Sequence, residues 1–166
     1  MINNGFDRAQ HRWNNRAIVL PLVATASIAF LFSLAGRMLA ETFLPARVPL
    51  LGEFVGLSPT ENAGVAFGIT FSPLLQIVLI SSALLLVAIL AWQSRKNRIQ
   101  ALGFGLILGG ALANIVDRFD DGFVTDFFQV GSWPTFNVAD SCITIGVGVL
   151  LLCYTRLPPH GHPLPH

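Results

Sequence analysis

Apolar residues along the chain gather into four long runs that are separated by polar segments. A helix needs about 20 mostly apolar residues to cross a membrane. Runs of this kind lie at about 17–38, 73–92, 99–117 and 137–156. The fourth run is uncharged only over 141–155, and its extension toward the preceding residues draws Asp140 to the membrane boundary. The pattern predicts one membrane domain, residues 1–166, with four transmembrane helices.

The composition also indicates a bilayer environment. Apolar residues make up 53% of the chain and charged residues only 11%, whereas a soluble domain carries roughly a quarter charged residues. The net charge of +1, without a basic patch interleaved with aromatic residues, gives no indication of nucleic-acid binding. Cys142 and Cys153 would lie about 16 Å apart on one helix, which is too far for a disulfide.

Basic residues predict the orientation of the spans. Seven of the ten flank one end of the bundle, namely Arg8, Arg12, Arg16, Arg95, Lys96, Arg98 and Arg156. The positive-inside rule makes this end cytoplasmic, so both termini lie inside and segments 39–72 and 118–136 lie outside. We expect the His/Pro-rich tail, 158–166, to be disordered.

The first span has an alternative interpretation as a cleaved signal peptide, because Ser33-Leu34-Ala35 is an acceptable small-x-small site. Its apolar run is longer than the roughly 7–15 residues of a signal-peptide core. This length favours an uncleaved anchor.

The two outer segments carry most of the polar chemistry. Arg47–Leu57 is too short and too marked by Gly and Pro for a helix, and it predicts a small β element along the membrane surface. Asn114 and Arg118 are four residues apart and share one helix face. Asp126 stands in an aromatic and β-branched run that we expect to lie against the membrane. Ionisable residues at membrane depth are costly, and are functional candidates for that reason.

Asp126 and Asp140 are the natural candidates for an acid pair. Two carboxyl groups brought together in a low dielectric share one proton, and such a pair can activate water and protonate a leaving amine. Alternatively, the acids of this region pair with Arg118 or cap helices. That alternative fits one or two acids, but 114–140 holds five against a single arginine: Asp117, Asp120, Asp121, Asp126 and Asp140.

Other hydrolytic sites fit the sequence poorly. No histidine lies between residues 12 and 159, which excludes a zinc site or a Ser-His-Asp triad in the core. The only lysine, Lys96, lies on the predicted inner side. An outer Ser-Lys pair is therefore excluded, and we expect no metal and no cofactor.

Two sequence blocks resemble those of the lipoprotein signal peptidase (signal peptidase II) family of bacterial inner membranes. The first, N-A-G-V-A-F-G at 62–68, is similar to the family's N-x-G-x-A-F-G. The second combines G-G-A-L-A-N-I-V-D-R at 109–118, G-F-V-T-D-F at 122–127 and F-N-V-A-D-S at 136–141. It resembles the family's G-G-A-x-x-N-x-x-D-R, G-x-V-x-D-F and F-N-x-A-D-S.

The resemblance implies a fold and an activity. The fold is an all-α polytopic membrane protein of four transmembrane helices, with a small periplasmic β-cradle and a short periplasmic helix. The activity is that of an intramembrane aspartyl endopeptidase, which removes signal peptides from diacylglyceryl-modified prolipoproteins by cleaving before the lipidated cysteine. The implied partners are these prolipoproteins and membrane phospholipids, and we expect a monomer. The implied location is the bacterial inner membrane, with the active site at the periplasmic face.

The resemblance also implies roles for individual residues. Asp126 and Asp140 match the catalytic pair. Positions that bind substrate or support the pair fall on Asn62, Gly64, Phe67, Asn114, Asp117, Arg118, Asn137, Ala139 and Arg37. The family's first span carries D-x-x-x-K, whereas this chain has Ser33 and Arg37 at those positions. Arg37 keeps the positive charge but not the geometry of lysine. The spacer between the two aspartates is also short for the family.

Two other functions are compatible with parts of the sequence. Ser33 is compatible with a catalytically impaired homologue that binds signal peptides or lipoproteins. A small transporter would use the acids as an ion path, but such a path needs a polar stripe along the spans. The polar residues here gather at one end.

Overall fold

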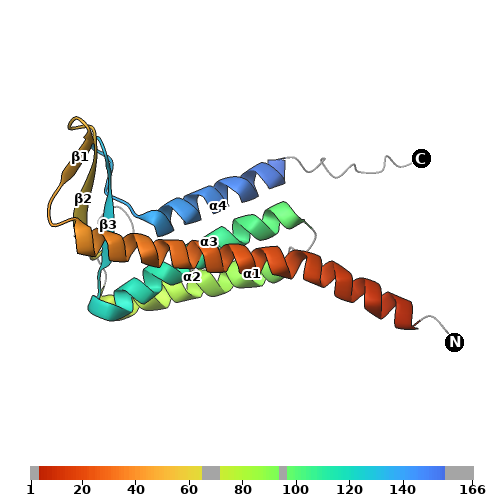
Figure 1. The fold of residues 1–166 in the computed structure, drawn as a ribbon. Coiled ribbons are helices and arrows are strands. Elements are labelled where there is room, and N and C mark those ends of the chain that lie inside the picture. Colours follow the sequence, from red (N-terminus) through yellow and green to blue (C-terminus); the bar gives the residue numbers. More distant parts are fainter. Residues whose placement is uncertain (1–3, 65–71, 94–96, 156–166) are drawn as a thin grey trace, which may run out of the picture.

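Four long helices and a small sheet make up the described part of the chain, which is residues 4–64, 72–93 and 97–155 of the computed structural model. The helices are α1 (Asn4–Phe43), α2 (Pro73–Gln93), α3 (Arg98–Asp121) and α4 (Val138–Thr155). Each is long and apolar enough to cross a membrane. They lie side by side with the sheet at one end (Figure 1). The predicted fold class is confirmed, and the chain is a multi-pass membrane protein.

Helix α1 is longer than the span predicted at 17–38, since it runs without a break from Asn4 to Phe43. Its first turns lie at the end of the molecule away from the sheet, beyond the other helices (Figure 1). Its last turns reach the sheet. The extension past residue 38 matters for the site because Glu41 belongs to this helix.

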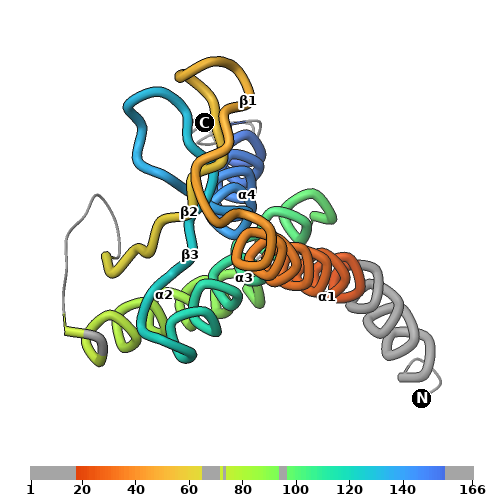
Figure 2. Tube along the Cα trace, turned by 60° about the vertical axis from the view of Figure 1, so that its left-hand side comes forward, coloured from red at the N-terminus to blue at the C-terminus, as the bar shows by residue number. Residues whose placement is uncertain are grey.

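Helix α3 packs against all three other helices (Figure 2). Glycines make the close approaches possible. A Cβ on Gly109 would overlap the carbonyl oxygen of Ala26 on α1, and one on Gly110 would lie 2.6 Å from the carbonyl oxygen of Ala139 on α4. Small residues allow membrane helices to pack backbone against backbone. The glycines of α3 therefore set how close α1 and α4 come to the bundle axis.

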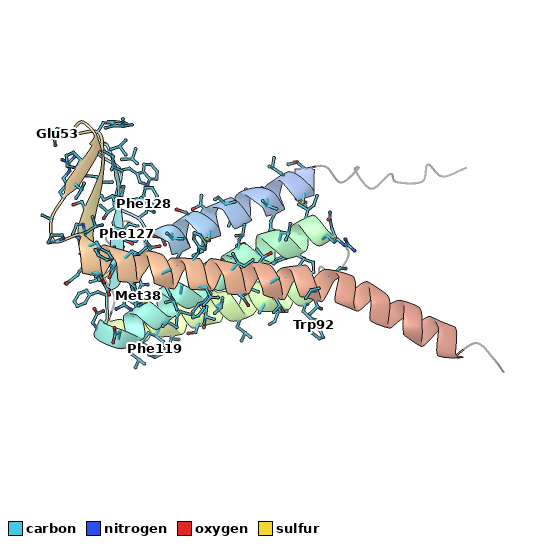
Figure 3. The ribbon with its side chains drawn as sticks, in the orientation of Figure 1. Met38, Glu53, Trp92, Phe119, Phe127 and Phe128 are labelled. Carbon is cyan, nitrogen blue, oxygen red and sulfur yellow. The ribbon has the colours of Figure 1, made fainter. Side chains whose placement is uncertain are left out.

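Large apolar side chains cover the outside of the bundle. They include Leu20, Leu31, Phe32, Leu74, Leu85, Leu151 and Leu152. Trp92, also exposed, lies at the end of the bundle opposite the sheet (Figure 3). So much exposed apolar surface is a liability in water, and a bilayer solvates it.

The sheet holds three antiparallel strands in the order β1-β2-β3: β1 (Val48–Leu51), β2 (Val55–Asn62) and β3 (Val124–Val130). The first two confirm the β element predicted at 47–57. The third was not predicted as a strand. Gly122 ends α3 in the left-handed conformation (φ 89°), and its N–H donates to the carbonyl oxygen of Arg118. This αL cap turns the chain back toward the sheet.

The short periplasmic helix that the family resemblance implies is not found in segments 44–64 and 122–137. Residues 65–71 lie outside the described part of the chain. Phe67, for which the sequence predicts a role in the site, is one of these residues.

The glycine contact between α1 and α3 gives a stability prediction. Gly109→Ala should force the two backbones apart and lower the free energy of unfolding by about 1–3 kcal/mol, the usual cost of overpacking. Gly148→Ala on α4 is the matched control, because a Cβ there meets no atom within 4 Å. Thermal unfolding in detergent should show a lower Tm for Gly109→Ala only. Equal Tm values for the two variants would contradict the proposed close contact.

Candidate active site

The carboxylate of Asp126 lies buried on β3, with 1% of the residue exposed. Its Oδ2 accepts a hydrogen bond from Asn62 Nδ2 at 2.8 Å, and its Oδ1 accepts one from Asn137 Nδ2 at 2.9 Å. Sheet register explains the first contact. Thr60 pairs with Asp126 and Asn62 with Val124, so Asn62 is a diagonal neighbour of Asp126 on the same face.

Backbone pairing brings Asn137 to Asp126. Phe136 forms a bridge with Phe128, in which each backbone N–H donates to the other residue's carbonyl oxygen, at 2.8 and 3.1 Å. The chain between β3 and α4 therefore returns along β3. The next residue, Asn137, reaches the Asp126 side chain while it also begins the fourth helix.

Asp140 lies in the first turn of α4 and forms a reciprocal cap with Asn137. Asn137 Oδ1 accepts from the Asp140 N–H at 2.9 Å, and Asp140 Oδ2 accepts from the Asn137 N–H at 3.3 Å. This is the arrangement of a capping box, with Asn as the cap and Asp three residues on. The other oxygen, Asp140 Oδ1, accepts from Asn114 Nδ2 of α3 at 2.9 Å.

Two carboxamides connect the two carboxylates. Asn137 Nδ2 also donates to Asn114 Oδ1 at 3.1 Å, so a continuous path of hydrogen bonds runs from Asp126 through Asn137 and Asn114 to Asp140. Burial raises the pKa of Asp126 to about 6, and the negative charge of Asp140 adds to the rise. Hydrogen bonds from Asn62 and Asn137 and the positive charge of Arg118 act in the opposite direction.

Arg118 and Gly64 fix the residues that follow β2. Arg118 Nη2 donates to the carbonyl oxygen of Gly64 at 2.7 Å, and the Gly64 N–H donates to Asn62 Oδ1 at 2.8 Å. Gln76 Nε2 of α2 donates to the carbonyl oxygen of Ala63 at 2.7 Å. Together these bonds hold the Asn62 carboxamide with its NH₂ group toward Asp126.

A second polar cluster lies around Arg37, at the sheet end of α1. Its guanidinium contacts three carboxylates: Glu41 Oε1 at 2.6 Å, Asp117 Oδ1 at 2.6 Å and Asp120 Oδ2 at 2.8 Å. Two of these acids hold Thr125, the neighbour of Asp126. The Thr125 N–H donates to Asp117 Oδ2 at 3.0 Å and its hydroxyl donates to Glu41 Oε1 at 3.0 Å. The Arg37 cluster therefore ties β3 to α1 and α3.

Glu41, Asp120 and Thr125 belong to this cluster although the sequence did not predict a role for them in the site. The spacing of Arg37 and Glu41, four residues apart on one helix, was an available signal. The contacts to Asp120 and Thr125 join residues 83 and 84 positions apart, which local patterns do not reveal. The hydroxyl of Ser33 donates to the carbonyl oxygen of Ala29 at 2.7 Å, within its own helix.

The structure brings the predicted site residues of the described segments to one end of the bundle, where α1, α3, α4 and the sheet meet. Ala139 lies there as well, with its carbonyl oxygen against Gly110. Within residues 4–64, 72–93 and 97–155, no group of three or more His, Cys, Asp or Glu side chains is arranged to hold a metal ion. The fold and this site define a multi-pass membrane protein with two carboxylates that accept hydrogen bonds from asparagine side chains at the sheet end of its helices.

Comparisons with known proteins agree with this description. A family model described as signal peptidase (SPase) II matches residues 23–156. The lipoprotein signal peptidase of Chlorobium luteolum is 36% identical over 133 residues, which cover 72% of this chain and 80% of the relative. That of Rhodococcus jostii is 37% identical over 149 residues, covering 79% and 75%. That of Syntrophomonas wolfei is 46% identical over 104 residues, covering 61% and 68%.

Among solved structures, the chain is similar to a bacterial membrane enzyme solved by the in meso method at 2.3 Å resolution. The TM-score is 0.75 at 23% identity, over 86% of this chain and 94% of that one. This likeness concerns the fold alone. From the family model and the relatives together, the chain belongs to the lipoprotein signal peptidase (signal peptidase II) family, a family of peptidases. The resemblance drawn from the two sequence blocks is confirmed.

Replacing Arg37 tests the second cluster. Arg37→Gln should lower the free energy of unfolding by about 3 kcal/mol, because it leaves the buried Asp117 without a countercharge. Arg47→Gln is the control, since Arg47 pairs with Glu53, whose side chain is 90% exposed, and otherwise donates only to the neutral oxygens Gln129 Oε1 and Glu53 O. No buried charge loses its partner in this variant, which should cost about 1 kcal/mol. Denaturation in detergent compares the two variants. Equal losses would show that the Arg37 cluster adds nothing beyond an exposed ion pair.

The raised pKa of Asp126 gives a pH prediction. Between about pH 4 and pH 6 the folded state keeps a proton that the unfolded chain, with the usual pKa of 3.8, has released. Linkage then makes the free energy of unfolding fall as pH rises through this window and level off above it. The total fall is about 3 kcal/mol. Asp126→Asn removes this contribution, so the stability of wild type relative to the variant should decline from pH 4 to pH 6. Parallel stability curves would contradict the shift.

Proposed function

We propose that this chain is an aspartic endopeptidase that removes signal peptides from diacylglyceryl-modified prolipoproteins by cutting before the lipidated cysteine. Asp126 and Asp140 are its catalytic pair. The observation that carries the proposal is the amide path through Asn137 and Asn114, which joins two carboxylates from separate elements. Membership of the signal peptidase II family supports the substrate class.

The surroundings of the two carboxyl groups suit different roles. Asp126 is buried with a pKa raised to about 6, which suits a group that holds a proton and donates it to a carbonyl oxygen. Asp140 accepts hydrogen bonds from Asn114 Nδ2 and from the Asn137 N–H in the first turn of α4, a geometry that suits the group proposed to take a proton from water. Pairs of acids with separated environments provide an acid and a base.

The reaction then runs in two steps. Asp140 takes a proton from water as the water oxygen bonds to the scissile carbonyl carbon, and Asp126 gives its proton to the carbonyl oxygen. In the second step the C–N bond breaks. Asp140 returns its proton to the leaving amine, and one hydroxyl of the tetrahedral intermediate returns a proton to Asp126. Both carboxyl groups end as they began, and the proposed reaction requires no metal or cofactor.

A groove between α2 and α4 supports lateral entry of the signal peptide. Its volume is about 380 Å³, and α3 forms its floor through Ile107 and Ala111. Ile143, three residues after Asp140, lies at its edge. An apolar peptide helix in this groove would lie in the membrane with its outer end at the catalytic pair. Asn62, Gly64, Phe67, Arg118 and Ala139 are proposed to hold the substrate backbone or support the pair.

The proposed location is the bacterial inner membrane, with both termini in the cytoplasm and the site at the periplasmic face. Arg8, Arg12 and Arg16 on the first turns of α1 and Arg98 at the start of α3 lie at the end opposite the sheet (Figure 1), and these basic residues support this orientation. The proposed partners are prolipoproteins and membrane phospholipids, and the proposed state is a monomer.

The catalytic pair, Asp126 and Asp140, is tested with purified variants and a diacylglyceryl-modified prolipoprotein. Asp126→Asn and Asp140→Asn should each lower cleavage at least 1,000-fold, on the scale of removing a catalytic group, while the protein stays folded. Asp121→Asn, at an exposed acid of the same outer end, is the control and should cleave normally. Cleavage at the wild-type rate by either Asp126→Asn or Asp140→Asn would overturn the assignment of the catalytic pair. Tight binding without turnover by the wild type would favour the alternative of an impaired homologue.

A further inference from the structure

An apolar cavity of about 600 Å³ lies under the sheet, between the outer end of α1 and the first residue of α4. On the α1 side it is lined by Phe32, Leu39 and Phe43, and on the sheet side by Leu57, Phe127 and Phe128. Figure 3 shows Phe127 and Phe128 between the sheet and the start of α4. The volume is in the range of sites that bind small apolar ligands.

The inner wall of this cavity is continuous with the catalytic site. Phe127 follows Asp126 directly, and Val138 follows Asn137. Gly36 allows α1 to approach this wall, since a Cβ there would lie 2.9 Å from Val138 Cγ2 and 3.3 Å from Phe127 Cζ. A ligand that fills the cavity as far as Phe127 would therefore lie next to the residue of β3 that follows Asp126.

The other side of the cavity opens toward lipid. Phe32, Ala35, Leu39 and Phe43 of α1 line it, and all four are exposed. Helix α1 is one of the four helices that are long and apolar enough to cross a membrane, so we expect these side chains to face lipid. The cavity thus joins the apolar phase of the membrane to the neighbourhood of the catalytic pair.

We infer that this α1 cavity binds an acyl chain of the diacylglyceryl group on the substrate's cysteine. The inference rests on the proposed function. The lipidated cysteine immediately follows the scissile bond, so its chains begin within a residue of the catalytic pair and must return to an apolar phase. The α2–α4 groove is taken by the signal-peptide helix in the proposed complex. The α1 cavity, on the sheet side of α4, offers a separate apolar route from the same point.

The inference predicts that the α1 cavity selects acyl-chain length. Ala35→Phe and Leu39→Trp each narrow it at exposed positions where folding is not at risk. With synthetic prolipoprotein peptides that carry palmitoyl or octanoyl diacylglyceryl groups, the ratio of kcat/KM for the long chain to that for the short chain should fall at least tenfold in both variants. Ala24→Phe adds the same ring to an exposed position of α1 away from the cavity, and should leave the ratio unchanged.

Each outcome has a separate meaning. If wild type cleaves both peptides but the narrowed variants keep the wild-type ratio, the acyl-chain inference is wrong while the proposed function stands. An equal loss of kcat/KM for both peptides also overturns the inference, because it would indicate that the cavity takes the peptide or a bystander phospholipid. If wild type cleaves neither peptide, the proposed function itself fails.

Discussion

The carboxamide of Asn137 holds the sheet end of this molecule together, because its two polar atoms form hydrogen bonds with three different elements. Its oxygen accepts the Asp140 N–H that opens α4, and its NH₂ group donates to Asp126 on β3 and to Asn114 on α3. A carboxamide offers two donors and an acceptor, and no carboxylate or hydroxyl of similar size supplies that combination. Asn137 is 5% exposed, so a lost bond would leave a polar atom unsatisfied away from water. Around the two carboxylates, the sheet, α3 and α4 are therefore joined by this one side chain.

Helix α3 connects this polar end to the apolar bundle. Its middle carries the glycines that admit α1 and α4, and its last turns carry Asn114, Asp117 and Arg118. Small residues fix the lateral distance between helices, while hydrogen bonds fix their position along the membrane normal. A slide of α1 past α3 would separate Arg37 from Asp117 and take Glu41 away from the hydroxyl of Thr125, the neighbour of Asp126. Packing in the lipid phase and geometry at the water boundary are therefore two requirements on the same helix.

Much of this arrangement follows from local patterns, and the rest does not for physical reasons. Hydrophobic runs predict the four helices, and the Gly/Pro-marked segment predicts the first two strands. Strand β3 is different, because Val124–Val130 becomes a strand only by pairing with β2 across more than sixty residues of sequence. The partners of Arg37 are equally non-local: five acids follow Asn114, and only the folded structure selects Asp117 and Asp120 among them. The motif blocks, by contrast, mark Asn62, Asn114 and Asn137 as a set, and the structure places all three around the two carboxylates.

The cap on α4 has a consequence for turnover. Asp140 closes the first turn of α4 by accepting the Asn137 N–H through a rather long bond of 3.3 Å, and in the proposed reaction the same oxygens take up and release a proton in every cycle. A protonated carboxyl is a poorer acceptor and loses its attraction to the positive end of the helix. The bond from the Asn137 N–H would then weaken and re-form once per peptide cut, while the bond from the Asp140 N–H to Asn137 Oδ1 is kept. The apolar turns of α4 that follow are packed on α3. They would confine this change to the first turn of the helix.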